Sequence, residues 1–171
     1  MAVLETIRKY FDIALANKDL SLLAILLFIF LIVLLGRLFK AFRNRHYSRI
    51  EKLLRAYSGR PREFEYFVAE LYEGLGYETE VTSGSRDGGK DIIMYKGRKK
   101  YAVEVKLYDQ DRKISREKIQ KLHSAMIDIE ADYGIFVTTS DFTADAEEYA
   151  DKYGIICVNG NKLSRMIKSS V

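Results

Sequence analysis

The pattern of apolar and polar residues divides the chain into a hydrophobic N-terminal part and a mixed C-terminal part. Residues 1–19 place apolar side chains at i, i+3 and i+4 with charged residues opposite, which predicts an amphipathic helix that lies in a membrane interface or packs on another subunit. Residues 20–39 are almost entirely aliphatic or Phe, and no charged residue occurs from Leu20 to Gly36. At ~1.5 Å per residue this run approaches the ~30 Å hydrocarbon thickness of a bilayer, so we expect one transmembrane helix.

The residues that flank this span predict its orientation. The apolar run is long for a secretory signal peptide, and it ends in basic residues rather than in a small-residue cleavage site. Lys and Arg are denser after the span than before it, and such residues collect on the cytoplasmic side. We therefore expect a single-pass protein of the cell membrane whose C-terminal domain is cytoplasmic and whose partners include the lipid bilayer.

Residues 40–60 are basic and carry a short apolar stripe, which predicts a helical stalk and linker. The stalk either lies near anionic lipid headgroups or contacts DNA. Pro61 suits the start of the next helix, so we place the boundary of a separate domain there.

Residues 61–171 alternate between helical and strand periods, as a single α/β domain does. Helices are expected at 62–75, at 115–130, after a cap at 140–143, and after 161, and strands at 77–83, 91–94, 101–106, 133–139 and 154–158. Because a helix separates the strand that holds Glu104 from the strand that holds Phe136, these two strands should pair in parallel. The sheet is therefore expected to be mixed, with helices on its faces.

Two strands of this domain gather charged side chains. Period-2 alternation places Ala102, Glu104 and Lys106 on one face of strand 101–106. Asp91 opens the preceding strand, and the basic turn between the two fits an antiparallel hairpin. Two carboxylates and one lysine can thus converge on one surface of the sheet.

The composition of the chain limits which partners, compartments and cofactors are expected. A chain of 171 residues has room for one domain plus an appendage, and its net charge of +4 favours polyanionic partners. One cysteine excludes an internal disulfide framework and fits a reducing compartment. The sequence contains no Cys/His cluster for zinc, no P-loop and no dinucleotide fingerprint.

A magnesium ion would explain the charged hairpin. Mg²⁺ prefers oxygen ligands and is usually held by one or two carboxylates together with a substrate phosphate, and Asp91 and Glu104 would supply those carboxylates. Mn²⁺ is the alternative ion. A metal there would polarise a phosphodiester, while Lys106 would orient water or stabilise the developing charge.

These residues resemble a known active site. Asp91, a spacer, and then Glu104-x-Lys106 are similar to the motif of the PD-(D/E)xK nucleases. The order of further motifs resembles the catalytic domain of the Mrr-type restriction endonucleases over about residues 62–167: Phe64-Glu65, Gly76-Tyr77, Val81-Thr82, Asp87-Gly88-Gly89-x-Asp91, Phe136-Val137-Thr138-Thr139-Ser140, Ala144 and Ala146. The resemblance implies a restriction-endonuclease-like α/β fold and metal-dependent cleavage of DNA.

The resemblance also implies residue roles. Asp91 and Glu104 would bind the metal, Lys106 would be the catalytic lysine, and Glu65 would be an accessory acid. Glu104 stands where many Mrr-type domains have Gln, which restores the commoner nuclease pattern. Two further departures concern DNA contacts: Lys90 replaces a residue that is usually aliphatic, and Leu107 replaces one that is often basic.

Other polar residues are candidates with ordinary alternatives. Asp87 either belongs to the site or caps its own turn, and Gln120 is an accessory candidate. Exposed basic residues that could hold phosphates, or could simply be solvated, are Lys96, Arg98, Lys99, Lys100, Arg112, Lys113, Arg116, Lys118 and Lys121. From these we select Lys96, Arg98, Lys99, Lys113 and Arg116 as the predicted DNA contacts.

The sequence therefore favours a membrane-anchored, Mg²⁺-dependent DNA endonuclease that restricts foreign or modified DNA. The alternatives are a catalytically inactive adaptor that binds nucleic acid and a structure-selective nuclease of the junction-resolvase kind. A homodimer is a reasonable expectation, because a duplex has two strands to cut.

Overall fold

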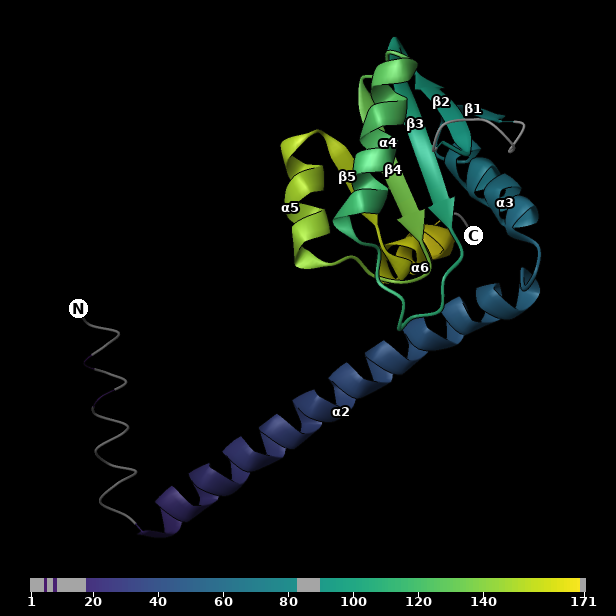
Figure 1. Cartoon of the computed structure of the whole chain (residues 1–171). Helices are drawn as coiled ribbons and strands as arrows, with labels where there is room; N and C mark the ends of the chain where they lie inside the picture. Colours follow the sequence, from purple (N-terminus) through teal and green to yellow (C-terminus); the bar gives the residue numbers. More distant parts are fainter. Residues whose placement is uncertain (1–4, 6–7, 9–17, 83–89, 170–171) are drawn as a thin grey trace. The chain divides into compact units, whose positions relative to one another are not determined.

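The structure is a computed structural model that describes residues 5, 8, 18–82 and 90–169 (Figure 1). Its contacts divide the chain into two compact units, 1–45 and 46–171. The amphipathic helix expected at 1–19 lies almost wholly outside the described residues, as does Asp87.

The first unit contains most of helix α2 (Lys18–Ala56). Within the described residues, one helix is long and apolar enough to cross a membrane, with its most apolar window at Ala24–Ala41. The large hydrophobic side chains from Ile25 to Phe39 are all exposed, by 40% to 68%. A helix of this composition fits a membrane span or a signal sequence, and its exposed face suits lipid better than water.

The second unit contains a sheet of five strands with four helices beside it (Figure 1). The elements are α3 (Pro61–Glu73), β1 (Glu78–Val81), β2 (Ile92–Lys96), β3 (Lys99–Lys106), α4 (Arg116–Asp128), β4 (Tyr133–Thr138), α5 (Ala144–Lys152), β5 (Ile155–Val158) and α6 (Gly160–Ser169). The strands lie in the order β1-β2-β3-β4-β5, with the first three antiparallel and the last three parallel. The expected mixed α/β sheet is confirmed.

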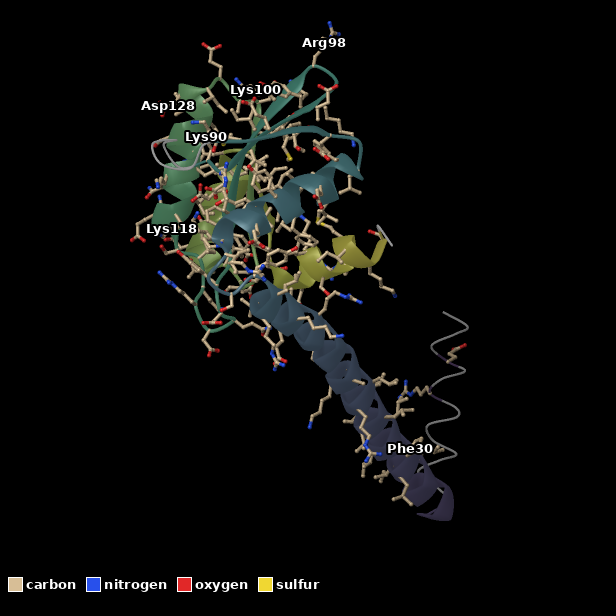
Figure 2. All side chains as sticks on the ribbon, turned by 90° about the vertical axis from the view of Figure 1, so that its right-hand side faces the viewer. Phe30, Lys90, Arg98, Lys100, Lys118 and Asp128 are labelled. Atoms are coloured by element: carbon tan, nitrogen blue, oxygen red, sulfur yellow. The ribbon has the colours of Figure 1, made fainter. Side chains whose placement is uncertain are left out.

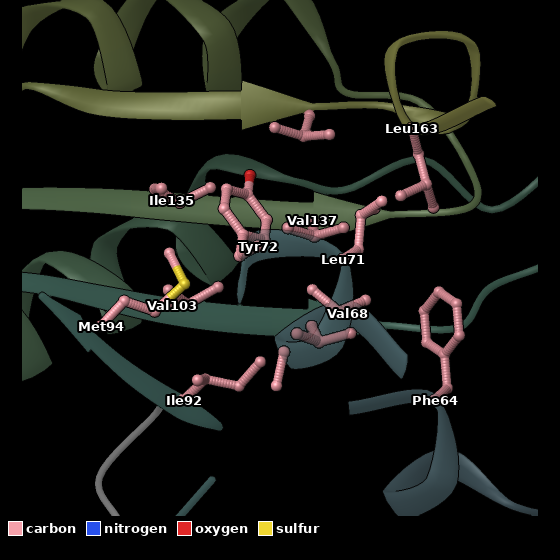
Figure 3. Packing of buried hydrophobic residues seen from close by; sticks show 13 residues of the cluster. Phe64, Val68, Leu71, Tyr72, Ile92, Met94, Val103, Ile135, Val137 and Leu163 are labelled. Atoms are coloured by element: carbon pink, nitrogen blue, oxygen red, sulfur yellow. The ribbon is translucent and has the colours of Figure 1, made fainter. Parts of the chain in front are cut away.

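The two faces of the sheet bury separate hydrophobic clusters because side chains alternate along each strand. Val103 and Val105 point into one cluster, beneath α3 and α6. Figure 3 shows this cluster, in which Phe64, Val68 and Leu71 of α3 meet residues of the sheet. Ala102 points into the other cluster, beneath α4 and α5. Strand β3 is therefore covered on both sides, which fixes the direction of every side chain along it.

The β2–β3 hairpin is antiparallel, as the sequence predicts, and its strands extend further toward the turn than the predicted ranges 91–94 and 101–106. Its turn consists of Gly97 and Arg98, and Gly97 has a φ of 60°. A two-residue turn with glycine in the left-handed region at its first position matches the right-handed twist of paired strands. The turn sets the register of the whole hairpin, and therefore sets which residues face each other at its open end.

The last turns of α2 belong to the second unit. Ile50 is only 2% exposed, and Leu53 packs against the cluster beneath α3 and α6. Arg49 donates from Nη1 to the carbonyl oxygen and the Oγ of Ser164, at 2.9 Å each. The region predicted as a basic stalk thus includes side chains that complete the core of the folded domain.

We expect Ile50→Ala to lower the free energy of unfolding by about 2–5 kcal/mol, because it leaves a cavity under a fully buried side chain. The full chain in detergent would be unfolded by heat and followed by near-ultraviolet circular dichroism. Lys52→Ala, on the exposed side of the same turn, should change stability by less than about 0.5 kcal/mol. Equal effects of the two substitutions would show that these turns are not part of the core.

Candidate active site

Asp91 and Glu104 lie side by side at the open end of the hairpin. The antiparallel pairing of Ile92 with Val103 makes them the next pair across the two strands. The Asp91 amide donates to the carbonyl oxygen of Val103 at 2.7 Å, and its carboxylate Oδ2 accepts from the Val105 amide at 2.8 Å. Backbone hydrogen bonds therefore fix the Asp91 carboxylate against strand β3.

Lys106 joins the two carboxylates. Its Nζ lies 2.6 Å from Oε1 of Glu104 and 3.2 Å from Oδ2 of Asp91. The same ammonium group donates to the carbonyl oxygen of Val105 at 3.1 Å. Because one ammonium contacts both carboxylates, Asp91 and Glu104 face the same side of the sheet and lie close enough to share a cation.

Burial and the neighbouring charges shift the pKa values of Glu104 and Lys106. Glu104 is 5% exposed, and its pKa is raised by burial and by the charge of Asp91, which outweigh the opposite effects of Lys106 and Lys121. Burial alone would lower the pKa of Lys106, but the two carboxylates raise it above its ordinary value. The ammonium thus stays charged and compensates two acids that would otherwise repel each other.

Glu104 keeps one oxygen without a partner. Its Oε2 is buried and accepts no hydrogen bond within the part of the chain that the structure describes. An unpaired buried carboxylate oxygen costs stability, so its presence indicates a position for a cation or an ordered donor.

The residues present fit a divalent cation that prefers oxygen ligands, such as Mg²⁺ or Mn²⁺. Asp91 and Glu104 offer carboxylate oxygens, and the carbonyl oxygen of Val105 faces the same ammonium that they contact. Residues 18–82 and 90–169 contain no group of three or more His, Cys, Asp or Glu side chains arranged to enclose a metal. An ion held by two carboxylates, with water and a substrate phosphate completing its shell, is the usual arrangement for Mg²⁺.

Glu65 approaches the cluster from α3, beneath the other face of the sheet. Its carboxylate is 14% exposed and accepts from Nη1 of Arg62 at 2.9 Å. Burial and the charge of Asp91 raise the pKa of Glu65, while Arg62 and Lys106 oppose this shift. The structure therefore places this acid within electrostatic reach of Asp91 and Lys106, at the border of the site.

The other predicted residues lie away from these carboxylates. Lys96, Arg98 and Lys99 sit at the closed tip of the hairpin, as Figure 2 shows for Arg98, whereas Asp91 lies at its open end. Lys96 donates to the carbonyl oxygen of Leu75 at 3.0 Å, and Lys99 contacts Oδ1 of Asp132 at 2.5 Å. These two lysines therefore make contacts within the fold.

The remaining predicted contacts lie on or before α4. Arg116 binds Oδ1 of Asp145 on α5 at 2.9 Å, and Gln120 is exposed on the helix surface. Lys113 lines a small polar cavity of about 210 Å³ together with Ser140 and Asn159, in the loops that follow the parallel strands. No hydrogen bond or ion pair among residues 18–82 and 90–169 joins these side chains to Asp91, Glu104 or Lys106.

Sequence reasoning missed the backbone of Val105. Alternation assigned its side chain to the core, where it is 4% exposed, yet its amide and carbonyl groups both serve the charged cluster. The pattern of side chains carries no signal for such a role. Thr138, on the neighbouring strand, also supports the site, because its Oγ1 donates to the carbonyl oxygen of Lys106 at 2.9 Å.

Comparison with known proteins gives two curated relatives. The chain is 37% identical over 91 residues to the uncharacterized protein y4cE of Sinorhizobium fredii (strain NBRC 101917 / NGR234), covering 51% of this chain and 23% of that protein. It is 28% identical over 116 residues to the type IV methyl-directed restriction enzyme EcoKMrr of Escherichia coli (strain K12), covering 63% of this chain and 38% of that enzyme. The chain therefore spans less than half the length of either relative.

Solved structures share the fold. The DNA modification-dependent restriction endonuclease AspBHI matches with a TM-score of 0.63 at 22% identity, covering 73% of this chain and 35% of that one. The MspJI restriction endonuclease, in complex with a 27-mer oligonucleotide, matches with a TM-score of 0.58 at 19% identity, covering 72% of this chain and 31% of that one. At these identities the likeness establishes a restriction-endonuclease-like fold.

The family model of the Mrr catalytic domain, described as a restriction endonuclease, matches residues 56–167. These residues include the whole charged cluster and every strand of the sheet. The chain belongs to the Mrr-type restriction endonuclease family.

Proposed function

We propose that this protein is a membrane-anchored, Mg²⁺-dependent endonuclease that hydrolyses DNA phosphodiester bonds, with modified DNA as its substrate. The observation that carries the proposal is the contact of a single ammonium with two neighbouring carboxylates, one of which keeps a buried oxygen without a partner. In a chain of this family, such an arrangement fits a divalent-cation site with a lysine beside it.

Each residue of the cluster has a role in this proposal. Asp91 and Glu104 would hold Mg²⁺, with the Val105 carbonyl as a further oxygen donor. When bound, the ion supplies Lewis-acid polarisation of the phosphodiester and lowers the pKa of water. Lys106 keeps its proton and its charge, so it can orient the attacking water or stabilise the negative charge that develops on the phosphate oxygens.

Glu65 would act as an accessory acid that affects the site indirectly. Its carboxylate is held by Arg62 at 2.9 Å, and it influences Asp91 through charge rather than through a hydrogen bond that the described residues display. We therefore assign it to tuning the site and holding Arg62 in place. Its loss should reduce the rate less than the loss of Asp91, Glu104 or Lys106.

Two comparisons support modified DNA as the substrate. The relative from Escherichia coli is described as methyl-directed, and AspBHI as dependent on DNA modification. The shared portion includes the proposed catalytic cluster, so we infer that this chain cuts such DNA as well. Membrane anchoring rests on α2, whose apolar window at Ala24–Ala41 is followed by basic residues that favour the cytoplasmic side.

The function is tested with purified full chain in detergent and with supercoiled plasmid, either unmodified or carrying methylated bases. We expect cleavage that requires Mg²⁺ or Mn²⁺, stops with EDTA, and is faster on methylated DNA. Binding without cleavage would instead identify a DNA-binding adaptor, and selective cutting of branched DNA would identify a structure-selective nuclease.

Substitutions in the cluster should separate chemistry from folding. Asp91→Asn, Glu104→Ala and Lys106→Ala should each lower the cleavage rate by at least ~10²-fold to 10³-fold, because each removes a group that acts on the transition state. Glu65→Gln should lower the rate about tenfold, and Glu63→Gln, on the exposed side of the same helix turn, should leave the rate unchanged. Cleavage by Glu104→Ala at the wild-type rate would remove our assignment.

Metal binding should be measurable without any DNA. A ligand that binds only the folded state stabilises it by about 2.7 kcal/mol at 100 times its Kd, so Mg²⁺ should raise the thermal midpoint by several degrees. Glu104→Ala should abolish this rise, because it removes a carboxylate with a free buried oxygen. An equal rise in wild type and Glu104→Ala would place the ion elsewhere.

Membrane anchoring predicts a fractionation result. The full chain expressed in bacteria should remain in the membrane pellet after extraction with alkaline carbonate. A reporter enzyme that works only in the cytoplasm should be active when it is fused after Val171. Replacing Leu27 and Leu31 with Asp should release the chain from the pellet, because charges at mid-bilayer are costly. Recovery of a shortened wild-type chain in the soluble fraction would indicate a cleaved leader instead.

A further inference from the structure

Helix α4 has two flanks with different surroundings. Its buried stripe, which includes Ile119 and Leu122, packs on the sheet. On one flank, His123 Nδ1 lies 2.9 Å from the hydroxyl group of Tyr149, and Arg116 binds Asp145, so this flank faces α5. At 100° per residue, Lys118 and Lys121 lie on the opposite flank.

This second flank borders the carboxylate cluster. Helix α4 covers the sheet face toward which Ala102 points, and Glu104 lies two residues further along the same face of β3. Helix α4 packs on strands β3 and β4, while α5, on its first flank, packs on β5 at the edge of the sheet. The second flank therefore faces the β2 side of the sheet, where Asp91 and Glu104 lie side by side. Figure 2 places Lys118 on α4, away from the hairpin tip that carries Arg98. The charge of Lys121 also lowers the pKa of Glu104, against the larger effect of burial, which agrees with this position.

The two lysines are exposed, and neither ammonium forms an ion pair in residues 18–82 or 90–169. Lys96 and Lys99, by contrast, are held by Leu75 and Asp132. An exposed lysine without an ion pair keeps its charge available for a ligand.

The charge of the cluster shows why such a ligand would need these lysines. Among these five side chains, Asp91, Glu104 and Glu65 are acidic, and the two basic ones, Lys106 and Arg62, are already paired with them. These five side chains therefore offer a DNA phosphate little attraction before metal binds. Cations placed just beside the carboxylates would hold the strand there without occupying the site itself.

We propose that Lys118 and Lys121, named here the α4 lysine pair, bind backbone phosphates of the DNA strand and position it over Asp91 and Glu104. The inference rests on the proposed nuclease function and specifies how the substrate is held. Both are positioning residues, since they contact the DNA backbone and not the reacting phosphate. Arg116 takes no part, because Asp145 and Tyr149 hold it on the other flank.

The test compares matched single-charge removals in the full chain. Lys121→Ala and Lys118→Ala should each raise the KM for plasmid cleavage about three-fold to tenfold and leave kcat within about twofold. The slope of log KM against log salt concentration should decrease by about one for each lysine removed, as expected when one phosphate contact is lost. Lys121→Arg should restore most of the affinity. Lys168→Ala removes an exposed charge on α6, beneath the other face of the sheet, and should leave KM and the salt slope unchanged.

Binding of a labelled short duplex, measured by fluorescence anisotropy in EDTA, tests the pair separately from cleavage. Wild type that binds DNA, and a Lys118→Ala/Lys121→Ala double variant that binds at least tenfold more weakly with an unchanged thermal midpoint, would support the pair even if no cleavage occurs. A double variant that matches Lys168→Ala in binding and in KM would overturn the inference while leaving the proposed function intact. A fall in kcat with unchanged KM would also overturn it.

Discussion

The contact of one ammonium with two adjacent carboxylates is the interaction on which the site depends. Like charges this close and this buried repel strongly, so Asp91 and Glu104 could not both stay ionised without a cation between or beside them. Lys106 supplies that cation in the absence of metal. The cluster is therefore stable enough to be built in advance, yet it retains an unpaired oxygen that favours a further positive charge.

The rest of the domain holds these three side chains in position. Both faces of strand β3 are covered, by α4 and α5 on one side and by α3 and α6 on the other, so its side chains cannot rotate to the opposite face. Parallel pairing with β4 adds a hydrogen bond from Thr138 to the carbonyl oxygen of Lys106. Sites built on strands that are buried on both faces keep their geometry better than sites on loops.

Local patterns were sufficient to predict the hairpin and its faces. Alternation along 101–106 separated Glu104 and Lys106 from Val103 and Val105, and the short basic turn before this strand indicated an antiparallel pair. These predictions succeeded because side-chain period and turn chemistry are local properties. The parallel pairing of β3 with β4 followed equally from the helix between them.

Features that depend on tertiary packing could not be predicted in this way. An apolar stripe near residue 50 looks the same whether it faces solvent, lipid or a core, and the structure buries Ile50 against the domain. Likewise, Arg116 and Lys121 are equally basic and equally exposed in sequence terms, but α5 covers only the flank that carries Arg116. The role of the Val105 backbone had no sequence signal at all.

The burial of Ile50 also affects how this domain can be exchanged between proteins in evolution. The family match begins at residue 56, and the nearest loop follows α2, but the core already includes a side chain from within that helix. A recombination event at the loop would transfer an incomplete core. Successful fusions of this nuclease domain to other N-terminal segments must therefore either carry the last turns of α2 with them or provide a new apolar side chain to fill the same space.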